Sequence, residues 1–433
     1  MSTVDTVDTV DTVVIGAGQA GLATSRLLTA AGREHVVLER GHIGERWRSE
    51  RWDSLRLLTP NWVLSLPGSR YGGPHPDAFA PADSFVEMLE EYAASFAAPV
   101  VDGTTVEEVR ASGRGTSRYV VTTDGGTWHT RHLVVATGPH GVPTLPAGLD
   151  HHVAGDVQLL TARDYRNPAQ VAPGGVLVVG ASASGVQIAE ELQRAGRQVT
   201  LAVGRHARLP RTYRGFDVYW WLEATGRLSR TLDDVEDREA ARSEPSLQLI
   251  GRHHGPRPDS EVDLAALQRH GVRLAGRLLE LTGGIARFAE DLSTRVTEAE
   301  RGMHRFLDVA DAYAERSGLV PEIWSPVRPR AVPLPSRTPT RCDLRAEEIF
   351  TIVVATGYRP HHPWLRLPVL GAGGAIEQEG GITSAPGVYT VGQRFQNGRG
   401  SGSIVGARVD AAAVVDDIER LSGRSRLSRE GAS

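Results

Sequence analysis

The sequence predicts an α/β protein with two Rossmann-like dinucleotide-binding domains, one inserted in the other. The stretch "TVVIGAGQAGLATSRLLTAAG" at 12–32 reads as a buried strand, a glycine-rich turn and a helix. The same pattern returns in "GGVLVVGASASGVQIAEELQRAGRQVTLAVGR" at 174–205. The string "VVATG" also occurs twice, at 134–138 and 353–357, each time as an apolar strand that closes on a turn. An internal repeat of this kind indicates two nucleotide-binding units in one chain.

The repeat also suggests where the domains begin and end. The lead-in contains the three-residue repeat "TVDTVDTVDT", which cannot bury a face alone and is therefore expected to be disordered. We expect a disordered lead-in at 1–10, a discontinuous FAD-binding domain at 11–150 and 345–422, an NADPH-binding domain with a helical insertion at 151–344, and a flexible tail at 423–433.

Local patterns predict several further elements. Residues 84–97 are predicted to form an amphipathic helix with Ser84 as its N-cap, and residues 119–138 a hairpin that leads into a buried strand. Residues 285–317 have a helical pattern. The stretch "VYWWLEATG" at 218–226 is expected to be a buried helix of the second domain, with the wall of a substrate channel as the alternative. The end of the chain predicts a strand, a glycine-rich loop and a long helix.

Composition excludes several kinds of chemistry. All 48 basic residues are arginine, so a lysine Schiff base and a P-loop lysine are excluded. The chain has one cysteine, Cys342, whereas a dithiol redox centre needs two, which excludes the disulfide-reductase mechanism. The net charge of −4 gives no reason to expect a nucleic-acid or membrane partner.

The sequence shows neither a membrane segment nor a metal motif. No apolar run approaches the ~20 residues that span a bilayer, and the N-terminus lacks the basic start and apolar core of a signal peptide. We therefore expect a cytoplasmic protein. Histidines occur in adjacent pairs, whose side chains diverge, and no pair of thiolates accompanies them, so we expect no metal site.

The first glycine motif is Gly16-Ala17-Gly18-Gln19-Ala20-Gly21, between a strand and a helix. Gly16 permits a tight turn, Gly18 lets the backbone approach a pyrophosphate, and Gly21 allows close packing of helix and strand. The next strand ends in Glu39 and Arg40, and Glu39 lies 23 residues after Gly16. A carboxylate there accepts hydrogen bonds from ribose hydroxyls and repels a 2′-phosphate, so the motif fits FAD or NAD and does not fit NADP.

The second motif, Gly180-Ala181-Ser182-Ala183-Ser184-Gly185, has serine at the middle glycine position. Its matching strand ends in Arg205, 25 residues after Gly180, where a guanidinium can bind a 2′-phosphate. His206, Arg208 and Arg211 follow; for Arg208 and Arg211 a solvated basic loop is an equal alternative. One site that rejects a 2′-phosphate and one that accepts it predict FAD and NADPH, and therefore a hydride relay between them.

The order of motifs from 11 to 420 resembles the class B flavin-dependent monooxygenases, closest to the bacterial, YUCCA-like branch. The resemblance is carried by these motifs in order: Gly16–Gly21, "GERWRSERWDSLRLLTP" at 44–60, "VVATGP" at 134–139, "DYRNP" at 164–168, Gly180–Gly185 and "VVATGYRP" at 353–360.

The resemblance implies roles for residues that the patterns alone do not assign. Around FAD it implies Ala20, Glu39, Arg40, Trp47, Arg48, Thr59, Val106, Ala136, Thr137, Gly138, Gly392, Ser403 and Ile404. Around NADPH it implies Tyr165, Asn167, Gly180, Ser182, Ala183, Ser184, Gly185, Arg205, His206, Arg211, Ala355, Thr356 and Gly357. Close to the flavin, where a catalytic group would act, it implies Leu58, Thr59, Asn61 and Thr161.

The resemblance also implies a single-component reaction. NADPH reduces FAD, O2 adds at C4a of the reduced flavin, and the C4a-(hydro)peroxyflavin passes one oxygen atom to a small organic substrate. The expected acceptor is a nucleophilic nitrogen or sulfur, or a keto-acid carbon. O2 and this substrate are the expected partners, and a homodimer is possible.

Two departures from the family pattern bear on the oxygen-transfer step. Thr161 stands where relatives have a histidine, and no tryptophan follows, which counts against a Baeyer–Villiger enzyme. Leu58 lies where some relatives have an asparagine beside the flavin, with Asn61 as a possible substitute. A Baeyer–Villiger monooxygenase, an NADPH-dependent flavin reductase or oxidase that produces H2O2, and a nucleotide-sensing protein without turnover are the alternatives.

Overall fold

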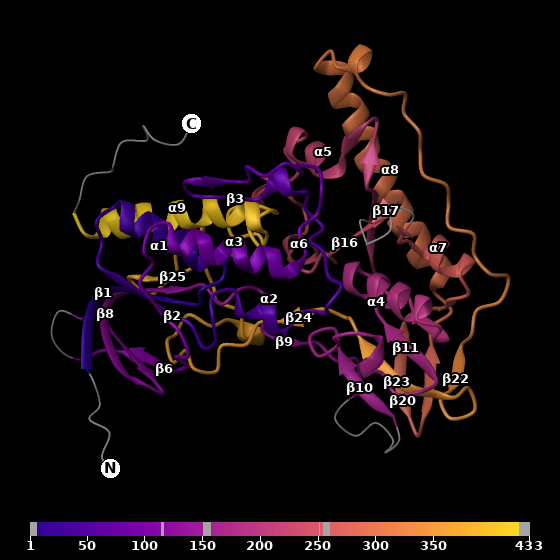
Figure 1. The fold of residues 1–433 in the computed structure, drawn as a ribbon, viewed down its shortest axis with the longest axis horizontal. Coiled ribbons are helices and arrows are strands. Elements are labelled where there is room, and N and C mark those ends of the chain that lie inside the picture. Colours follow the sequence, from indigo (N-terminus) through magenta and orange to yellow (C-terminus); the bar gives the residue numbers. More distant parts are fainter. Residues whose placement is uncertain (1–6, 114–116, 150–156, 251, 254–259, 424–433) are drawn as a thin grey trace.

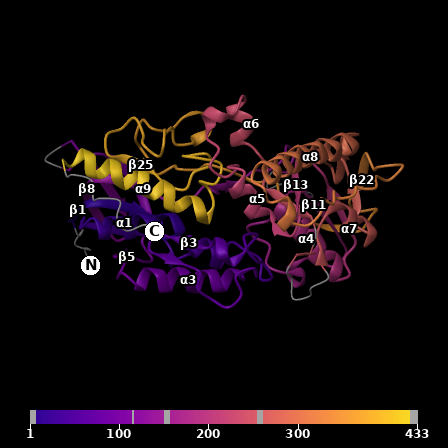
Figure 2. The same ribbon diagram turned by 90° about the horizontal axis from the view of Figure 1, so that it is seen from above.

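The computed structural model of the chain describes residues 7–113, 117–149, 157–250, 252–253 and 260–423, which form two lobes (Figure 1). The lobes lie side by side when seen from above (Figure 2). The first contains both the N-terminal strand and the C-terminal helix, and the second contains the middle part of the chain. This α/β architecture with two nucleotide-binding-type lobes confirms the predicted fold class.

The first lobe is built on one mixed sheet. Its strands in spatial order are β5 (Val100–Val101), β2 (His35–Leu38), β1 (Val7–Ile15), β8 (Gly126–Val135), β7 (Tyr119–Thr123) and β6 (Val106–Ala111). β1 is parallel to β2 and to β8, whereas β7 and β8 form the predicted antiparallel hairpin. The last strand of the chain, β25 (Val388–Thr390), returns to this sheet and pairs with Leu133–Val135 of β8.

Strand β1 begins at Val7, inside the residues that we expected to be disordered. Val7 to Val10 pair in parallel register with Thr127 to Thr130 of β8. The expectation of a disordered lead-in is therefore wrong for residues 7–10. A repeat that cannot fold alone gains backbone hydrogen bonds here because β8 extends beyond the core and offers it an edge.

Helices cover one face of the first sheet, the face against which the helix after the glycine loop packs. They are α1 (Gln19–Ala30), α9 (Ile404–Leu421), α3 (Ala82–Ala94) and the short α2 (Glu45–Ser49). α1 packs against α9, and Leu22, Val14, Val134 and Val414 meet in one buried core. The predicted N-cap of α3 is wrong. The helix begins at Ala82 after Pro81, whose extended backbone (φ −59°, ψ 159°) turns the chain into the helix before Ser84 is reached.

The second lobe has a parallel sheet. Its strands in spatial order are β10 (Gln158–Thr161), β23 (Ile349–Val354), β11 (Gly175–Val179), β12 (Val199–Ala202) and β19 (Arg273–Ala275). β23 follows residue 345 in the chain but pairs with β10 and β11. The expected boundary at 345 is therefore too early, because buried Ile352 and Val353 need the second sheet as their packing partner.

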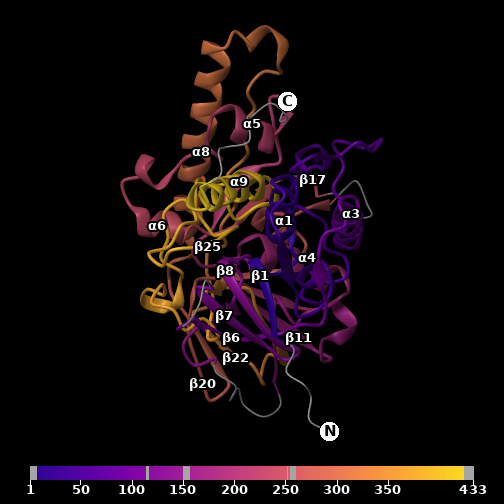
Figure 3. The ribbon, with the colours of Figure 1, turned by 90° about the vertical axis from the view of Figure 1, so that its left-hand side faces the viewer.

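In the described part of the second lobe, helices surround this sheet or extend from it. They are α4 (Ala183–Arg194), α7 (Leu264–Arg269), α5 (Val218–Ala224), α6 (Arg238–Arg242) and α8 (Leu292–Arg316). α8 rises above the rest of the molecule (Figure 3). α5 confirms the prediction of a buried helix, since Trp221 is fully buried among the side chains of α5 and α8.

The predicted helix at 285–317 is correct only from Leu292. Ile285–Phe288 instead forms β21, between β20 (Leu278–Thr282) and β22 (Arg341–Asp343). Gly283 and Gly284 have φ values of +58° and +77°, and this left-handed pair turns the chain back into a hairpin before the helix can begin.

Short strand pairs complete the described structure. They are β13 (Ala207–Pro210) with β16 (Leu247–Ile250), β14 (Thr212–Tyr213) with β15 (Phe216–Asp217), β3 (Ser65–Leu66) with β4 (Ser69–Arg70), β17 (Arg252–His253) with β18 (Ser260–Glu261), and β9 (Val142–Pro143) with β24 (Tyr358–Arg359). The last pair is antiparallel and joins the two segments that pass between the lobes. Among the described residues no helix combines the length and apolar character needed to span a bilayer.

Candidate functional site

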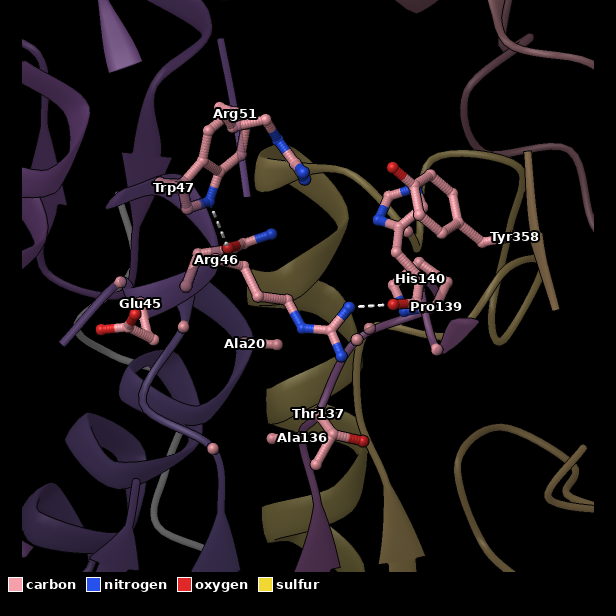
Figure 4. A pocket seen from close by; sticks show the side chains of 18 of the residues that line it. Ala20, Glu45, Arg46, Trp47, Arg51, Ala136, Thr137, Pro139, His140 and Tyr358 are labelled. Carbon is pink, nitrogen blue, oxygen red and sulfur yellow. Dashed lines mark hydrogen bonds between the residues drawn. The ribbon is translucent and has the colours of Figure 1, made fainter. Parts of the chain in front are cut away.

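A cavity of about 590 Å³ lies between the lobes and is lined by residues from both. This volume is within the range of small-molecule sites. The glycine loop after β1 and the first turn of α4 both contribute to its wall. Figure 4 shows Arg46 in the middle of the pocket, with Trp47 and Arg51 on one side and His140 and Tyr358 on the other. The repeated units of the sequence therefore meet at one site.

The first glycine loop is fixed by close backbone contacts. Gly16 has φ +107°, and a Cβ on it would lie 2.8 Å from the carbonyl oxygen of Ala136. A Cβ on Gly21 would lie 1.8 Å from the carbonyl oxygen of Gly16, so helix and strand can pack this closely only with glycine. The buried Glu39 accepts a hydrogen bond of 2.7 Å from the backbone N–H of Ala17. The predicted acid therefore lies at the loop.

The start of α1 fits a phosphate group. Its N-cap is Gly18, no side chain caps the helix, and the first turn lies at the cavity wall. A Cβ on Gly18 would meet no atom within 4 Å, so the space in front of this residue is open to a ligand. Uncapped backbone N–H groups at a helix N-terminus bind anionic oxygens. The loop therefore has the donors and the space that the pyrophosphate of FAD requires.

The second glycine loop repeats this geometry. Gly180 has φ +109°, and its Cβ would lie 2.5 Å from the carbonyl oxygen of Ala355. A Cβ on Gly185 would lie 1.8 Å from the carbonyl oxygen of Gly180. The N-cap of α4 is Ser182, again without a side-chain cap, and Ala183 begins the part of the helix that lines the cavity. The loop has the donors that a second dinucleotide requires.

Charged side chains make the cavity wall electropositive. Its arginines are Arg40, Arg46, Arg51, Arg56 and Arg163, and its acids are Glu39 and Glu45. The excess of arginine suits ligands that carry several phosphates. Burial, with a smaller effect of the neighbouring arginines, lowers the pKa of His140 to about 3. The His140 ring is therefore neutral and adds no charge to the wall.

Arg40 was predicted as a site residue, whereas Arg46 and Arg51, which also line the cavity, were not. Arg46 donates to the carbonyl oxygen of His140 (Figure 4), and the Arg51 guanidinium lies 5.1 Å from the centre of the Trp47 ring. Both arginines belong to the motif at 44–60, and this motif was the sequence feature from which they could have been predicted as site residues. Only the packing of segments far apart in the chain, which a local pattern does not contain, shows that they face the same space as His140 and Tyr358.

The structure brings many of the predicted residues to the cavity and leaves others outside it. Lining the cavity are Gly16, Gly18, Ala20, Glu39, Arg40, Trp47, Leu58, Thr59, Val106, Ala136, Thr137, Gly138, Ala183, Ser184, Gly392, Ser403 and Ile404. Outside its lining are Gly21, Arg48, Asn61, Thr161, Tyr165, Asn167, Gly180, Ser182, Gly185, Arg205, His206, Arg211, Ala355, Thr356 and Gly357.

Three of the residues outside the lining bind residues of their own lobe. Arg48 forms an ion pair with Glu90 of α3, and the side-chain N–H of Asn61 donates to the carbonyl oxygen of His75. Thr161, at the end of β10, donates its hydroxyl hydrogen to Asp164 over 2.6 Å. These hydrogen bonds and ion pairs organise the protein around the cavity.

Asn167 binds the first lobe directly, and Tyr165 holds the Glu191 carboxylate that binds it at a second point. The Tyr165 hydroxyl donates to Glu191 of α4 over 2.7 Å, and Ser54 donates to the other oxygen of the same carboxylate over 2.6 Å. The Asn167 amide donates to Asp53 over 2.6 Å. The "DYRNP" segment therefore fastens residues 53–54 of the first lobe to the second.

Replacing Tyr165 with phenylalanine tests this interpretation. Because the variant loses a hydrogen bond to a charged group, we expect the free energy of unfolding to fall by about 1–3 kcal/mol. The KM for NADPH should stay within about twofold, since a fastening residue does not touch the dinucleotide. Denaturant unfolding and steady-state kinetics measure the two quantities, and a raised KM at unchanged stability would instead place Tyr165 against NADPH.

Arg205 is exposed at the end of the second unit. Its guanidinium donates to the carbonyl oxygen and the hydroxyl of Ser243, and both acceptors are neutral. His206 is buried, and its Nδ1 lies 3.0 Å from the carbonyl oxygen of Gly204. Burial lowers the pKa of His206, so its ring is neutral at pH 7. Of Arg205 and His206, Arg205 is therefore the residue whose charge is available to a phosphate.

A buried carboxylate supports the loop that closes the cavity between Gly392 and Ser403. Asp410 of α9 is fully buried and accepts hydrogen bonds from Asn397 (2.9 Å) and Ser401 (2.8 Å). Burial raises the pKa of Asp410 to about 6, although these hydrogen bonds act in the opposite direction. The carboxyl group therefore titrates near the physiological range.

The shift gives a pH dependence of stability. The folded state keeps the Asp410 proton up to about pH 6, whereas the unfolded chain loses it near pH ~4. The stability that the proton provides is therefore present below pH ~4 and is lost as the pH rises through about 6. Relative to Asp410→Asn, the wild type should lose up to a few kcal/mol over this interval. Unfolding curves from about pH 4 to about pH 8 measure it, and parallel pH profiles would contradict the shift.

Two helix N-termini of similar geometry, which open from two lobes on one electropositive cavity, indicate a protein that binds two dinucleotides. The comparisons with known proteins agree with this class. Residues 13–224 match the family described as pyridine nucleotide-disulphide oxidoreductase. An uncharacterised CzcO-like oxidoreductase of Geobacillus kaustophilus is 30% identical over 94% of this chain and 97% of its own length.

A plant enzyme and a bacterial structure extend the comparison. The indole-3-pyruvate monooxygenase YUCCA1 of Oryza sativa is 29% identical over 94% of this chain and 90% of its own length. A flavin-containing monooxygenase from Stenotrophomonas maltophilia has the same fold, with a TM-score of 0.62 and 20% identity over 96% of this chain and 99% of its own. The chain belongs to the class B flavin-dependent monooxygenase family, with the CzcO-like oxidoreductases, and is a flavin-dependent enzyme. FAD and NADPH, the predicted cofactors, are the pair that this family uses.

Proposed function

We propose that this protein is a single-component, NADPH-dependent FAD monooxygenase that transfers one oxygen atom from O2 to a small organic substrate. The acceptor is a nucleophilic nitrogen or sulfur, or a keto-acid carbon. The observation that carries the proposal is that two uncapped helix N-termini, α1 and α4, open on one cavity between the lobes. Membership of a monooxygenase family supports it.

Each dinucleotide has residues that suit it. In this proposal FAD binds at Gly16–Gly21 and Glu39, with Val106 near its adenine and Leu58 and Thr59 near its ring. NADPH binds at Gly180–Gly185 with Arg205 at its 2′-phosphate. Arg46 and Arg51 offset phosphate charge inside the cavity. The discontinuous division into an FAD-binding and an NADPH-binding domain is part of this proposal, with the return to the first domain after Val354 rather than at 345.

Cys342 counts against thiol chemistry at this site. It lies in β22, is buried, and is absent from the cavity lining. Burial raises the pKa of its thiol to about 12, so almost no thiolate is present at pH 7. The chain has no second cysteine. A disulfide-reductase reaction of the kind named in the matched family description is therefore disfavoured here.

The protein's part in the reaction is positional. FAD, when bound, supplies hydride acceptance and O2 activation. The helix N-termini hold the phosphates, the fastened residues 53–54 keep the lobes together, and the loop between Gly392 and Ser403 covers one side of the cavity. Excluding water from this space favours oxygen transfer over release of H2O2.

The proposal is tested by following the oxygen. The purified protein, loaded with FAD, is supplied with NADPH, ¹⁸O2 and a panel of amines, sulfides and keto acids. We expect one ¹⁸O atom in the product for each NADPH consumed, and a clear preference for NADPH over NADH. Quantitative H2O2 with no labelled product across the panel would make the protein an NADPH oxidase. Turnover of cyclic ketones to esters would make it a Baeyer–Villiger enzyme.

A further inference from the structure

Arg211 was predicted at NADPH, but its side chain reaches toward the first lobe. It lies between β13 and β14 of the second lobe and is buried, with 4% of its surface exposed. Its Nη1 donates to the backbone carbonyl oxygen of Leu58. Its guanidinium carbon lies 3.8 Å from the centre of the Phe79 ring. Both partners belong to the first lobe.

Leu58 and Phe79 lie on two segments that form one wall. Residues 55–61 and 78–82 pair through backbone hydrogen bonds, including Leu57 N–H to Ala80 (2.9 Å) and Asn61 N–H to Ala78 (2.8 Å). Arg56, Leu57, Leu58 and Thr59 of the first segment line the cavity. Arg211 is not among the residues that line the cavity, and its guanidinium contacts both segments of this wall.

The contact involves a desolvated charge. Within its own lobe, Arg211 forms an ion pair with Asp217 (Nε to Oδ2, 2.9 Å), and Asp217 also caps α5. The face toward the first lobe carries the Leu58 carbonyl and the Phe79 ring, while Tyr219 lies 5.9 Å away in α5. A buried guanidinium needs each of these partners, because an unpaired charge away from water is strongly destabilising.

We propose that Arg211 is a positioning residue through which the second lobe fixes the cavity wall at residues 55–61. The assignment of this wall to the flavin rests on the proposed function, but the contact itself does not. Planarity matters here: the guanidinium stacks on Phe79 and bonds Leu58 at the same time, which a lysine ammonium cannot do.

The chain offers a matched control. Arg214 is also buried, lies in the same segment and pairs with Asp311 at 3.0 Å, but its partners Asp311 and Trp324 belong to the second lobe. Arg211→Gln and Arg214→Gln therefore remove similar buried charges, and only the first removes a contact between the lobes. Arg211→Lys keeps the charge beside Asp217 without the planar group.

Hydrogen exchange of the apoprotein tests the proposal without any turnover. In Arg211→Gln we expect the amides of Leu57 and Asn61 to exchange about 10- to 100-fold faster, with a smaller rise in Arg211→Lys, since a hydrogen bond to a charged group is lost. Arg214→Gln should leave both amides unchanged even if its melting temperature falls equally. Unchanged exchange in Arg211→Gln, or an equal rise in Arg214→Gln, would overturn the proposal.

A second readout uses the protein loaded with FAD. The visible circular dichroism of the bound flavin should change in Arg211→Gln and stay as in the wild type in Arg214→Gln. If amide hydrogen exchange changes in Arg211→Gln but the flavin spectrum does not, Arg211 positions the wall, and the wall lies away from the flavin ring. That result contradicts the proposed flavin placement and leaves the positioning role intact.

Discussion

Replacing Gly18 with alanine is expected to weaken FAD binding by about 10- to 100-fold while the protein still folds. The residue has φ −81° and ψ −177°, which alanine adopts freely, and an added methyl group would meet no protein atom. The methyl group would instead occupy the space in front of the helix where the pyrophosphate is proposed to bind. Lost hydrogen bonds to a charged group account for the size of the effect.

Titration of the apoprotein with FAD, followed by flavin fluorescence, gives the dissociation constant. Gly302→Ala is the matched control. This glycine lies inside α8, and its Cβ would have Nη2 of Arg305, 3.9 Å away, as its nearest side-chain neighbour, so alanine fits there. Alanine should stabilise that helix slightly and leave FAD binding unchanged. Wild-type affinity in Gly18→Ala would place the pyrophosphate elsewhere.

Replacing Arg205 with alanine is expected to remove most of the preference for NADPH. Because its partners at Ser243 are neutral, the guanidinium charge is available to a 2′-phosphate. The ratio of kcat/KM for NADPH to that for NADH should fall by about 10- to 100-fold, mainly through NADPH.

Steady-state oxidation of NADPH and, in separate assays, of NADH, both in air, measures this ratio. Arg194→Ala serves as the control, because Arg194 is an exposed arginine of the same lobe whose partner is Glu190. Its removal should leave the ratio unchanged. Equal losses with NADPH and NADH in Arg205→Ala would show that the 2′-phosphate binds elsewhere.

The parts of the site that sequence could predict are those made within one continuous unit. Gly16, Gly21 and Glu39 belong to a single strand–helix–strand unit, where the close approach of helix and strand demands particular residues at fixed spacing. The same reasoning applies to Gly180 and Gly185. The structure places all five at or beside the two loops, as the spacing predicted.

Other features depend on contacts between distant segments. Tyr165 and Asn167 match a motif, but the motif does not reveal that their partners are Glu191 and Asp53. The beginning of β1 likewise depends on β8, more than a hundred residues later, and not on its own repeat. The local pattern therefore singled out Tyr165 and Asn167, but it did not contain the residues that they bind or the strand with which β1 pairs.

The pairing of Val7–Val10 with β8 has a practical consequence. If residues 1–10 were treated as disordered, a variant could be trimmed to begin at residue 11. That variant leaves Thr127–Thr130 with backbone N–H and C=O groups exposed along one side. An open strand edge of this kind is a template for pairing with other chains. Among the described residues β2 pairs with β1 only from Thr12, so in the full chain the open edge of this part of the sheet runs along Val7–Val10, and trimming moves that edge to β8, beside the hairpin with β7.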